Sequence, residues 1–126
     1  MKSRTYLMTI ALISIFLSCK KNGTGGDVKI DAFPEHHGAP IYGATIYVKF
    51  GASDLPADPT NKYDLKVDGQ PNENKIQING LRYGKYYIYS VGYDSSIHLP
   101  VTGGIPVEIK WKERKKELTL HVPVSE

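Results

Sequence analysis

The sequence contains almost no cysteine, because Cys19 is the only one among 126 residues. An intramolecular disulfide is therefore excluded, and a domain of this length must be stabilised by its apolar core. The chain also lacks the G-x-S-x-G, P-loop and H-E-x-x-H motifs that position nucleophiles, phosphates or zinc. We therefore expect a protein that is not an enzyme and that has no cofactor.

An excess of charge of one sign is also missing. The chain has 16 basic and 13 acidic side chains, and two of the basic ones fall within the first 18 residues, so the remainder has a net charge of +1. No basic stripe is large enough to dominate binding to phosphates, which disfavours nucleic-acid partners. The one basic cluster, residues 110–116, includes Glu113 and is predicted to be a solvated turn between strands.

Long apolar runs are absent except near the start of the chain. Lys2 and Arg4 precede a mostly apolar run, residues 7–17, that has the length of the h-region of a secretory signal. A membrane-spanning helix needs about 20 apolar residues, so this run is too short to be one. The pattern predicts a cleaved signal peptide over residues 1–18.

The four residues Phe16-Leu17-Ser18-Cys19 resemble a bacterial lipobox, in which signal peptidase cuts before a cysteine that carries diacylglycerol. Lipoboxes usually have leucine three residues before the cysteine, and Phe16 holds that position here. A lone cysteine in an exported chain agrees with lipid attachment. We therefore predict that Cys19 is the lipid attachment site; the alternative is an ordinary signal peptide with an incidental cysteine.

The rest of the chain has the pattern of an all-β domain. Residues 19–26 are small, polar and glycine-rich, which predicts a flexible tether ahead of a domain over residues 27–126. Apolar residues then alternate with polar ones between turns rich in Gly, Pro, Asn and Asp, and no helical period of useful length occurs. This pattern predicts a seven-stranded antiparallel Greek-key sandwich. Its strands are expected at residues 28–33, 44–50, 63–67, 75–79, 85–93, 107–111 and 118–122.

Three stretches carry a family resemblance: GATIYV at 43–48, IQINGLRYGKYYI at 76–88 and GY at 92–93. They resemble the carboxypeptidase-regulatory and collagen-adhesin B-type group, with its course G-A-x-V-x-V, F-x-G-L-x-x-G-x-Y-x-L and a later G-Y. The resemblance implies a prealbumin-like, Ig-like sandwich, a fold that hosts many functions. The whole chain also resembles small lipoproteins of Bacteroidetes-type bacteria, which implies a place in the cell envelope.

Five of the nine tyrosines fall between residues 83 and 93. Strand alternation places Tyr86 and Ile88 in the core and Tyr87, Tyr89 and Tyr93 on the opposite face. In one interpretation these three rings pack as cross-strand neighbours with their hydroxyls in water. In the other they form an exposed patch that binds a partner. We keep Tyr87, Tyr89 and Tyr93 as candidate partner-binding residues.

Metal-compatible side chains fall in loops that reversing strands would bring to one end of the sandwich, namely loops 34–42, 68–74 and 94–104. They lack a recognised ligand spacing, and adjacent histidines in an extended segment point to opposite sides. We therefore assign no metal site and expect surface histidines. The side chains in question are His36, His37, Asp68, Glu73, Asp94 and His98.

The leading hypothesis is a non-enzymatic, lipid-anchored module that binds a protein or a glycan as a monomer. Two alternatives stay open: a small metal-binding protein or enzyme that uses the end with His36, His37 and His98, and a structural, pilus-like subunit. The lipid would anchor the protein to the inner or outer membrane. Lys20 and Lys21 replace the acidic residues that often follow the cysteine in surface-exported lipoproteins of that bacterial group, which favours a domain facing the periplasm.

Overall fold

The computed structural model describes residues 21–126, and the predicted signal peptide and Cys19 lie outside this part of the chain. Within residues 21–126, no helix combines the length and the apolar character that crossing a membrane requires. The described elements are β1 (Thr24–His36), β2 (Ala39–Pro40), β3 (Thr45–Phe50), β4 (Leu65–Asp68), β5 (Ile76–Leu81), β6 (Gly84–Asp94), β7 (Leu99–Ile109), the 3-10 helix η1 (Trp111–Glu113) and β8 (Glu117–Pro123).

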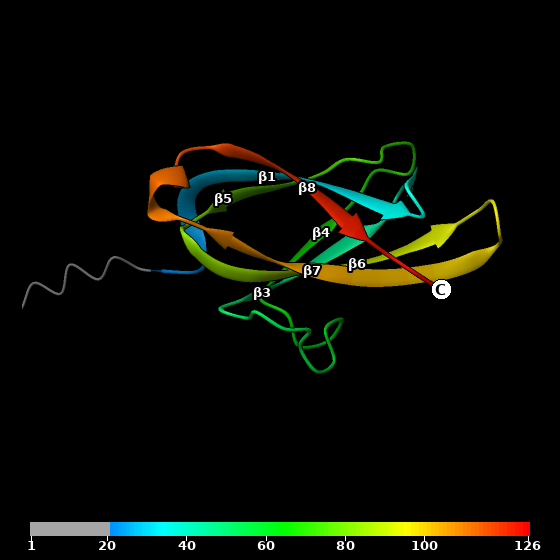
Figure 1. Ribbon diagram of the computed structural model, residues 1–126, viewed down its shortest axis with the longest axis horizontal. Coiled ribbons are helices and arrows are strands. Elements are labelled where there is room, and N and C mark those ends of the chain that lie inside the picture. Colours follow the sequence, from blue (N-terminus) through cyan, green and yellow to red (C-terminus); the bar gives the residue numbers. More distant parts are fainter. Residues whose placement is uncertain (1–20) are drawn as a thin grey trace, which may run out of the picture.

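The strands form two sheets that pack face to face, so the predicted all-β sandwich is confirmed (Figure 1). In one sheet β1 lies between β5 and β8, and the short β2 pairs with the end of β1. The other sheet has the order β4-β3-β6-β7. Two details differ from the prediction: β2 adds an eighth strand, and β8 runs parallel to β1. A parallel pair needs a long crossover, and here the whole second sheet lies between the two strands in the sequence.

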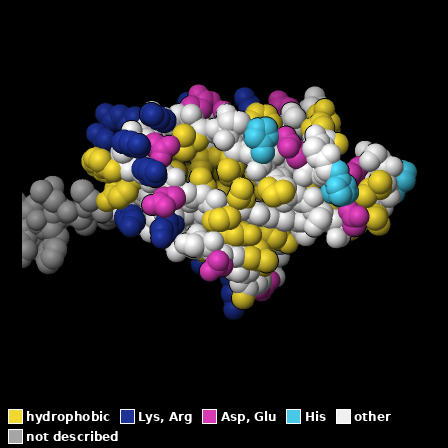
Figure 2. Space-filling model, in the orientation of Figure 1, with side chains coloured by type: hydrophobic (Ala, Val, Ile, Leu, Met, Phe, Trp, Pro, Cys, Tyr) yellow, Lys and Arg dark blue, Asp and Glu magenta, His cyan; other side chains and the backbone are white. Residues whose placement is uncertain are grey.

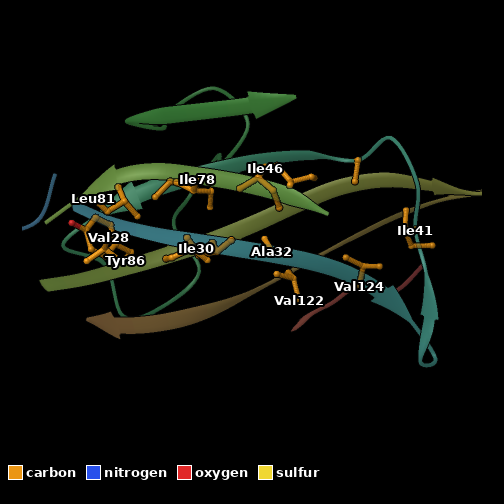
Figure 3. Close-up of a cluster of buried hydrophobic side chains, with 14 of the residues drawn as sticks. Val28, Ile30, Ala32, Ile41, Ile46, Ile78, Leu81, Tyr86, Val122 and Val124 are labelled. Carbon is orange, nitrogen blue, oxygen red and sulfur yellow. The ribbon is translucent and has the colours of Figure 1, made fainter. Parts of the chain in front are cut away.

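One apolar core fills the space between the sheets (Figure 3). Alternate residues of each strand point into it, as the period-two pattern requires. A fully buried Val, Leu or Ile side chain contributes about 1.5–3 kcal/mol relative to an exposed one. Among residues 21–126, all of the buried core residues lie between Val28 and Val124.

The register of β6 agrees with the sequence prediction. Tyr86 and Ile88 are fully buried in the core, and Ser90 follows on the same face. The Tyr86 hydroxyl accepts a hydrogen bond from the backbone N–H of Gly23 at 2.8 Å and donates one to the carbonyl of Arg82 at 2.7 Å. Burial is the main cause that raises the pKa of Tyr86 above its usual value. This hydroxyl therefore ties the start of the described chain to the base of β6.

Strand β7 begins well before the predicted strand 107–111 and takes in most of the predicted loop. It is an edge strand, and the backbone of Thr102 points outward, where it exchanges two hydrogen bonds of 2.9 Å with Ser125. Alternate residues share that direction, so Pro100 and Pro106 stand at outward positions where no partner needs a backbone donor. Both prolines are thus compatible with one long edge strand.

The first strand begins inside the segment for which a flexible tether is predicted. Thr24 is in register with Leu81, and Gly26 packs so closely on the Leu81 carbonyl that any Cβ there would collide with it. Asn22 donates its backbone N–H to the carbonyl of Tyr83 at 2.9 Å. Glycines that suggested flexibility therefore allow close backbone contact instead.

Candidate functional site

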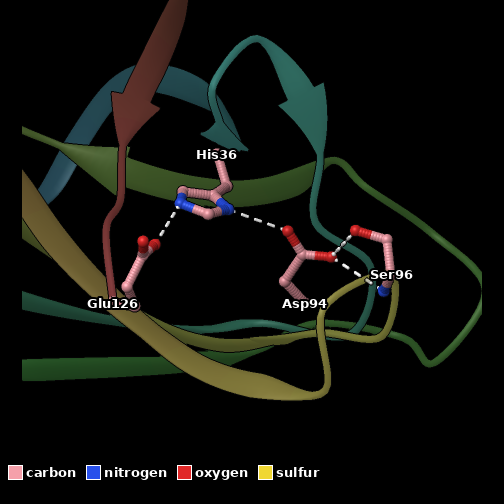
Figure 4. A network of polar contacts seen from close by, with 4 residues as sticks. All are labelled: His36, Asp94, Ser96 and Glu126. Carbon is pink, nitrogen blue, oxygen red and sulfur yellow. Dashed lines mark hydrogen bonds and ion pairs between the residues drawn. The ribbon is translucent and has the colours of Figure 1, made fainter.

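Side chains from three distant parts of the sequence meet at one end of the sandwich (Figure 4). His36 is the last residue of β1, Asp94 is the last residue of β6, and Glu126 follows β8. The end of the chain is held in place by backbone bonds, since the Val124 N–H donates to the Glu35 carbonyl at 2.9 Å. The strand ends therefore bring together a histidine and two carboxylates that the sequence keeps far apart.

The turn between β1 and β2 brings the neighbouring His37 to the same place. His37 and Gly38 have φ angles of 52° and 79°, and positive angles at both central residues are those of a type I′ hairpin turn. The ring centroids of His36 and His37 are consequently 4.2 Å apart. The expectation that these adjacent histidines point to opposite sides is wrong, because it assumed an extended backbone at both.

The His36 ring is buried and its orientation is fixed by Asp94. His36 Nδ1 lies 2.8 Å from Asp94 Oδ2, in hydrogen-bond geometry. The other oxygen of Asp94 accepts hydrogen bonds from the backbone N–H of Ser96 at 2.9 Å and from its hydroxyl at 2.5 Å. A carboxylate held in this way can only accept, so His36 donates from Nδ1 and its Nε2 points away from Asp94.

Nε2 of His36 points at Glu126. It lies 2.6 Å from Glu126 Oε2, yet the contact lacks hydrogen-bond geometry and the buried nitrogen has no hydrogen-bond partner among the described residues. The Glu126 side chain is about half exposed, at 51 %. The buried nitrogen is thus aimed at a carboxylate that can move.

The charges of this network shift the pKa values of its members in the directions that an ion pair requires. The hydrogen bond to Asp94 is the main cause that raises the pKa of His36, with Glu126 adding to it and burial opposing it. The Ser96 hydroxyl, followed by His36, lowers the pKa of Asp94 to about 2. At pH values above the pKa of Asp94 and below the pKa of His36, the pair therefore holds a proton on His36 and a negative charge on Asp94.

Stability is expected to depend on pH through this pair. The raised pKa of His36 stabilises the fold fully below its ordinary value of 6.5, and this contribution disappears as the pH rises through the folded-state value. The lowered pKa of Asp94 contributes above 3.8 and is lost as the pH falls towards about 2. In metal-free buffer the melting temperature should therefore be highest between these two ordinary values. The Asp94→Asn variant should show a smaller decline on the alkaline side, because only Glu126 then raises the pKa of His36, and an unchanged pH profile in that variant would contradict the assignment.

The remaining metal-compatible side chains at this end are not part of the group. Among residues 21–126, His36, His37 and Glu126 are the set whose ligand atoms all lie within 4.8 Å of one another. His98 lies in the β6–β7 turn with a φ angle of 54°, and Asp68 accepts a hydrogen bond from the Thr45 hydroxyl at 3.0 Å. The predicted grouping of His36, His37 and His98 is therefore realised only for the first two.

The three candidate tyrosines of β6 differ in exposure. Tyr87 is buried at 8 %, because its ring lies against Gly104 of β7, and burial raises the pKa of its hydroxyl. Tyr89 is half-buried and lies opposite Tyr47 of the neighbouring strand β3. Tyr93, in contrast, is 52 % exposed. The three tyrosines therefore present one exposed ring, that of Tyr93 at the end of β6, and not a continuous patch.

Tyr93 belongs to a recess of about 270 Å³ beside the histidine network. The nearby Tyr42 is 54 % exposed, so two aromatic rings face solvent next to proline side chains and the Asp94 carboxylate. Loops 34–42, 68–74 and 94–104, which are predicted to gather at this end, all contribute residues to the lining of the recess. Its lining residues are Pro40, Ile41, Tyr42, Pro71, Tyr93, Asp94 and Ser95.

The opposite end of the sandwich is basic (Figure 2). The predicted turn of residues 110–116 contains η1 and joins β7 to β8, and it has five basic side chains and one acidic one. Its exposed Trp111 packs edge-on against Tyr83, with ring centroids 4.9 Å apart, and Arg114 lies 4.2 Å from the indole centroid. Residue 21, the first one described, lies at this same end (Figure 1).

Sequence reasoning missed Glu126, which gives no signal as a lone acidic residue far from the histidines in the sequence. Gly38 did carry a signal, since a glycine in a two-residue connection between strands favours a tight hairpin turn with positive φ angles. Comparison of the chain with protein-family models, with curated proteins and with solved structures finds no match.

Proposed function

We propose that this protein is a non-enzymatic β-sandwich that is anchored by a lipid on Cys19 in a bacterial cell envelope, facing the periplasm. In this proposal it binds a protein or glycan partner at the end farthest from the lipid. The observation that carries the proposal is the opposite placement of two surfaces. The basic end holds the start of the described chain, and the exposed tyrosines and their recess lie at the other end.

The distance between the lipid and the domain supports this orientation. Only two residues, Lys20 and Lys21, lie between Cys19 and Asn22, which is hydrogen-bonded to the domain, and the three extended residue steps from Cys19 to Asn22 span at most about 11 Å. That is close to the Debye length of about 8–10 Å in physiological salt, so the basic turn would sense an anionic leaflet. Trp111, exposed at 54 %, is the side chain that favours the membrane–water interface.

The opposite end has the composition of a binding surface. Tyrosine rings supply a large contact area at low cost in side-chain entropy, and their hydroxyls can hydrogen-bond to a partner. Pro40 and Pro71 make the walls of the recess stiff, and the exposed Ser95 supplies a polar group at its edge. This mixture suits a protein or a sugar better than a purely apolar ligand.

The anchor is tested by replacing Cys19 with serine. We expect that cells fed an alkyne fatty acid label the wild-type chain but not Cys19→Ser, and that the variant leaves the membrane fraction entirely. Serine offers no thiol to the lipid transferase, which is the reason for complete loss. Equal labelling of the two chains, or a wild-type chain that is soluble and unlabelled, would refute the anchor.

The binding surface is tested by site-specific photo-crosslinking in intact cells. A benzophenone amino acid at position 93 or 42 is expected to give a discrete crosslinked product, and the same group at Tyr63 is not. Tyr63 is a matched control because it is an exposed tyrosine, at 39 %, that is absent from the recess lining. An array of envelope polysaccharides probed with residues 21–126 covers the glycan case. If positions 93 and 42 give no crosslinked product and the domain binds no polysaccharide on the array, the proposal is overturned.

The pilus-like alternative needs a strand edge that accepts another chain. Along β7 the outward backbone positions include Pro100 and Pro106, which cannot donate, and Thr102, which already pairs with Ser125. These are the devices with which sheets block edge-to-edge addition. The described β7 edge therefore gives the alternative no support.

A further inference from the structure

We propose that His36, His37 and Glu126 form a binding site for a divalent transition-metal ion, with Zn²⁺ as the best-matched ion. Their ligand atoms lie within 4.8 Å of one another at the end of the sandwich opposite the basic turn. Two imidazoles and one carboxylate form a ligand set that zinc accepts and that Ca²⁺ and Mg²⁺, which prefer oxygen ligands, do not. The site goes beyond the proposed binding function and does not depend on the lipid anchor.

His36 has the orientation that a metal ligand needs. Histidine ligands commonly donate their second ring nitrogen to a carboxylate, which fixes the tautomer and the direction of the coordinating nitrogen. Here Nδ1 is engaged by Asp94 at 2.8 Å, and Asp94 is itself held by Ser96 (Figure 4). Nε2 is left buried, without a hydrogen-bond partner, and directed at Glu126. Asp94 is therefore a positioning residue for the proposed site.

The backbone at His37 determines where its ring lies. His37 occupies the first central position of the type I′ turn, with a positive φ angle. The same conformation places its ring 4.2 Å from that of His36. The turn therefore delivers a second imidazole to a place that an extended strand could not reach.

The dimensions of the group suit a tetrahedral ion after a small movement. With metal–ligand distances of about 2.0–2.1 Å, two ligands of a tetrahedral ion are about 3.3 Å apart. His36 Nε2 and Glu126 Oε2 are 2.6 Å apart, so the half-exposed glutamate must withdraw slightly to admit the ion. His37 and Glu126 are both exposed, which leaves a fourth position for water or for a ligand atom of a partner.

A simple ion pair between His36 and Glu126 is the competing interpretation. It accounts for their proximity, but it gives no role to His37 and leaves the His36 nitrogen outside hydrogen-bond geometry. The two interpretations differ in what a change at His37 does. If only an ion pair is present, His37 can be replaced without affecting any metal affinity.

The test uses the full chain, extracted in detergent, stripped with a chelator and titrated with Zn²⁺ by calorimetry and with Co²⁺ by visible absorption. We expect one ion per chain with micromolar or tighter affinity and the absorption of tetrahedral Co²⁺. His37→Asn preserves the turn, because Asn-Gly is the preferred I′ pair, and should weaken binding by at least about tenfold. His98→Asn is the matched control. It makes the same change at another histidine with positive φ at this end of the sandwich, and it should bind as the wild type does.

Two further variants separate the roles of the carboxylates. Glu126→Gln removes a ligand charge and should weaken binding at least as much as His37→Asn. Asp94→Asn leaves all three ligands in place and should weaken it by about 10–100-fold. Repeating the titration with Cys19→Ser removes any contribution of a free thiol, so that a failed lipid anchor and a failed metal site give different results. The proposal is overturned by a wild-type chain without saturable binding, or by His37→Asn and Glu126→Gln chains that bind like the wild type.

Discussion

Replacing Tyr86 with alanine is expected to lower the free energy of unfolding by about 3–5 kcal/mol, the usual cost of removing a large aromatic side chain from a core. Tyr86 is fully buried, and its ring packs edge-on against Phe50 with centroids 5.6 Å apart. It lies where the base of β6 meets the first described residues, so the cavity would open at the junction of the two sheets. Strand β6 is paired on both sides, by β3 and by β7, which limits how far the site can collapse.

The conservative change Tyr86→Phe separates the ring from the hydroxyl. It keeps the buried ring but leaves the Gly23 N–H and the Arg82 carbonyl without the partner that lies 2.8 and 2.7 Å away. A buried polar group left unpaired costs about 1–3 kcal/mol, so this variant should lose that much. The loss should be accompanied by faster hydrogen exchange at Gly23, because its N–H no longer has an acceptor.

Urea unfolding of residues 21–126, which include all of the described core residues, measures both changes. Tyr42→Ala and Tyr42→Phe are the matched controls, since the Tyr42 ring is 54 % exposed and should tolerate either change to within about 0.5 kcal/mol. A Tyr86→Phe variant as stable as the wild type would show that the hydroxyl does not hold the first residues in place. Tyr86→Ala and Tyr42→Ala variants of equal stability would contradict the buried position of Tyr86.

The fold class could be predicted because most strands have one buried face and one solvated face. β3 is the clearest case, where Ile46 and Val48 are buried and Tyr47 between them is not. β7 could not be predicted over its full length, because Gly103 and Gly104 interrupt the alternation and prolines suggest a loop. Only its place at the sheet edge makes these residues acceptable, and edge position is a property of the assembled sheet.

The candidate site was predictable only in part, for the same physical reason. Strand reversal correctly placed His36 and Asp94 at one end, because the direction of each strand follows from the order of the strands. The position of Glu126 beside His36 depends on the parallel pairing of β8 with β1, which no local sequence pattern predicts. The position of His37 depends on a single backbone conformation, and the extended chain assumed from the sequence gives the opposite answer.

Gly84→Ala is expected to destabilise the domain by about 2–6 kcal/mol, from two costs that act together. Gly84 has a φ angle of 137°, in a sparsely populated region that costs a residue with a Cβ about 1–3 kcal/mol. The added Cβ would also collide with the Asn22 side-chain oxygen and lie 2.9 Å from the Asn22 backbone nitrogen. Overpacking of this kind costs about 1–3 kcal/mol. The Asn22 oxygen, which accepts a hydrogen bond from the Lys85 N–H at 2.6 Å, would have to leave.

Gly38→Ala isolates the first of these costs, because Gly38 has a φ angle of 79° and nothing within 4 Å of an added Cβ. It should therefore lose only the conformational term of about 1–2 kcal/mol. Removing the clashing side chain with Asn22→Gly should make the Gly84→Ala change less costly than it is in the wild type, a coupling that a double-mutant cycle of urea midpoints measures. If the two changes are additive, Asn22 does not press on Gly84.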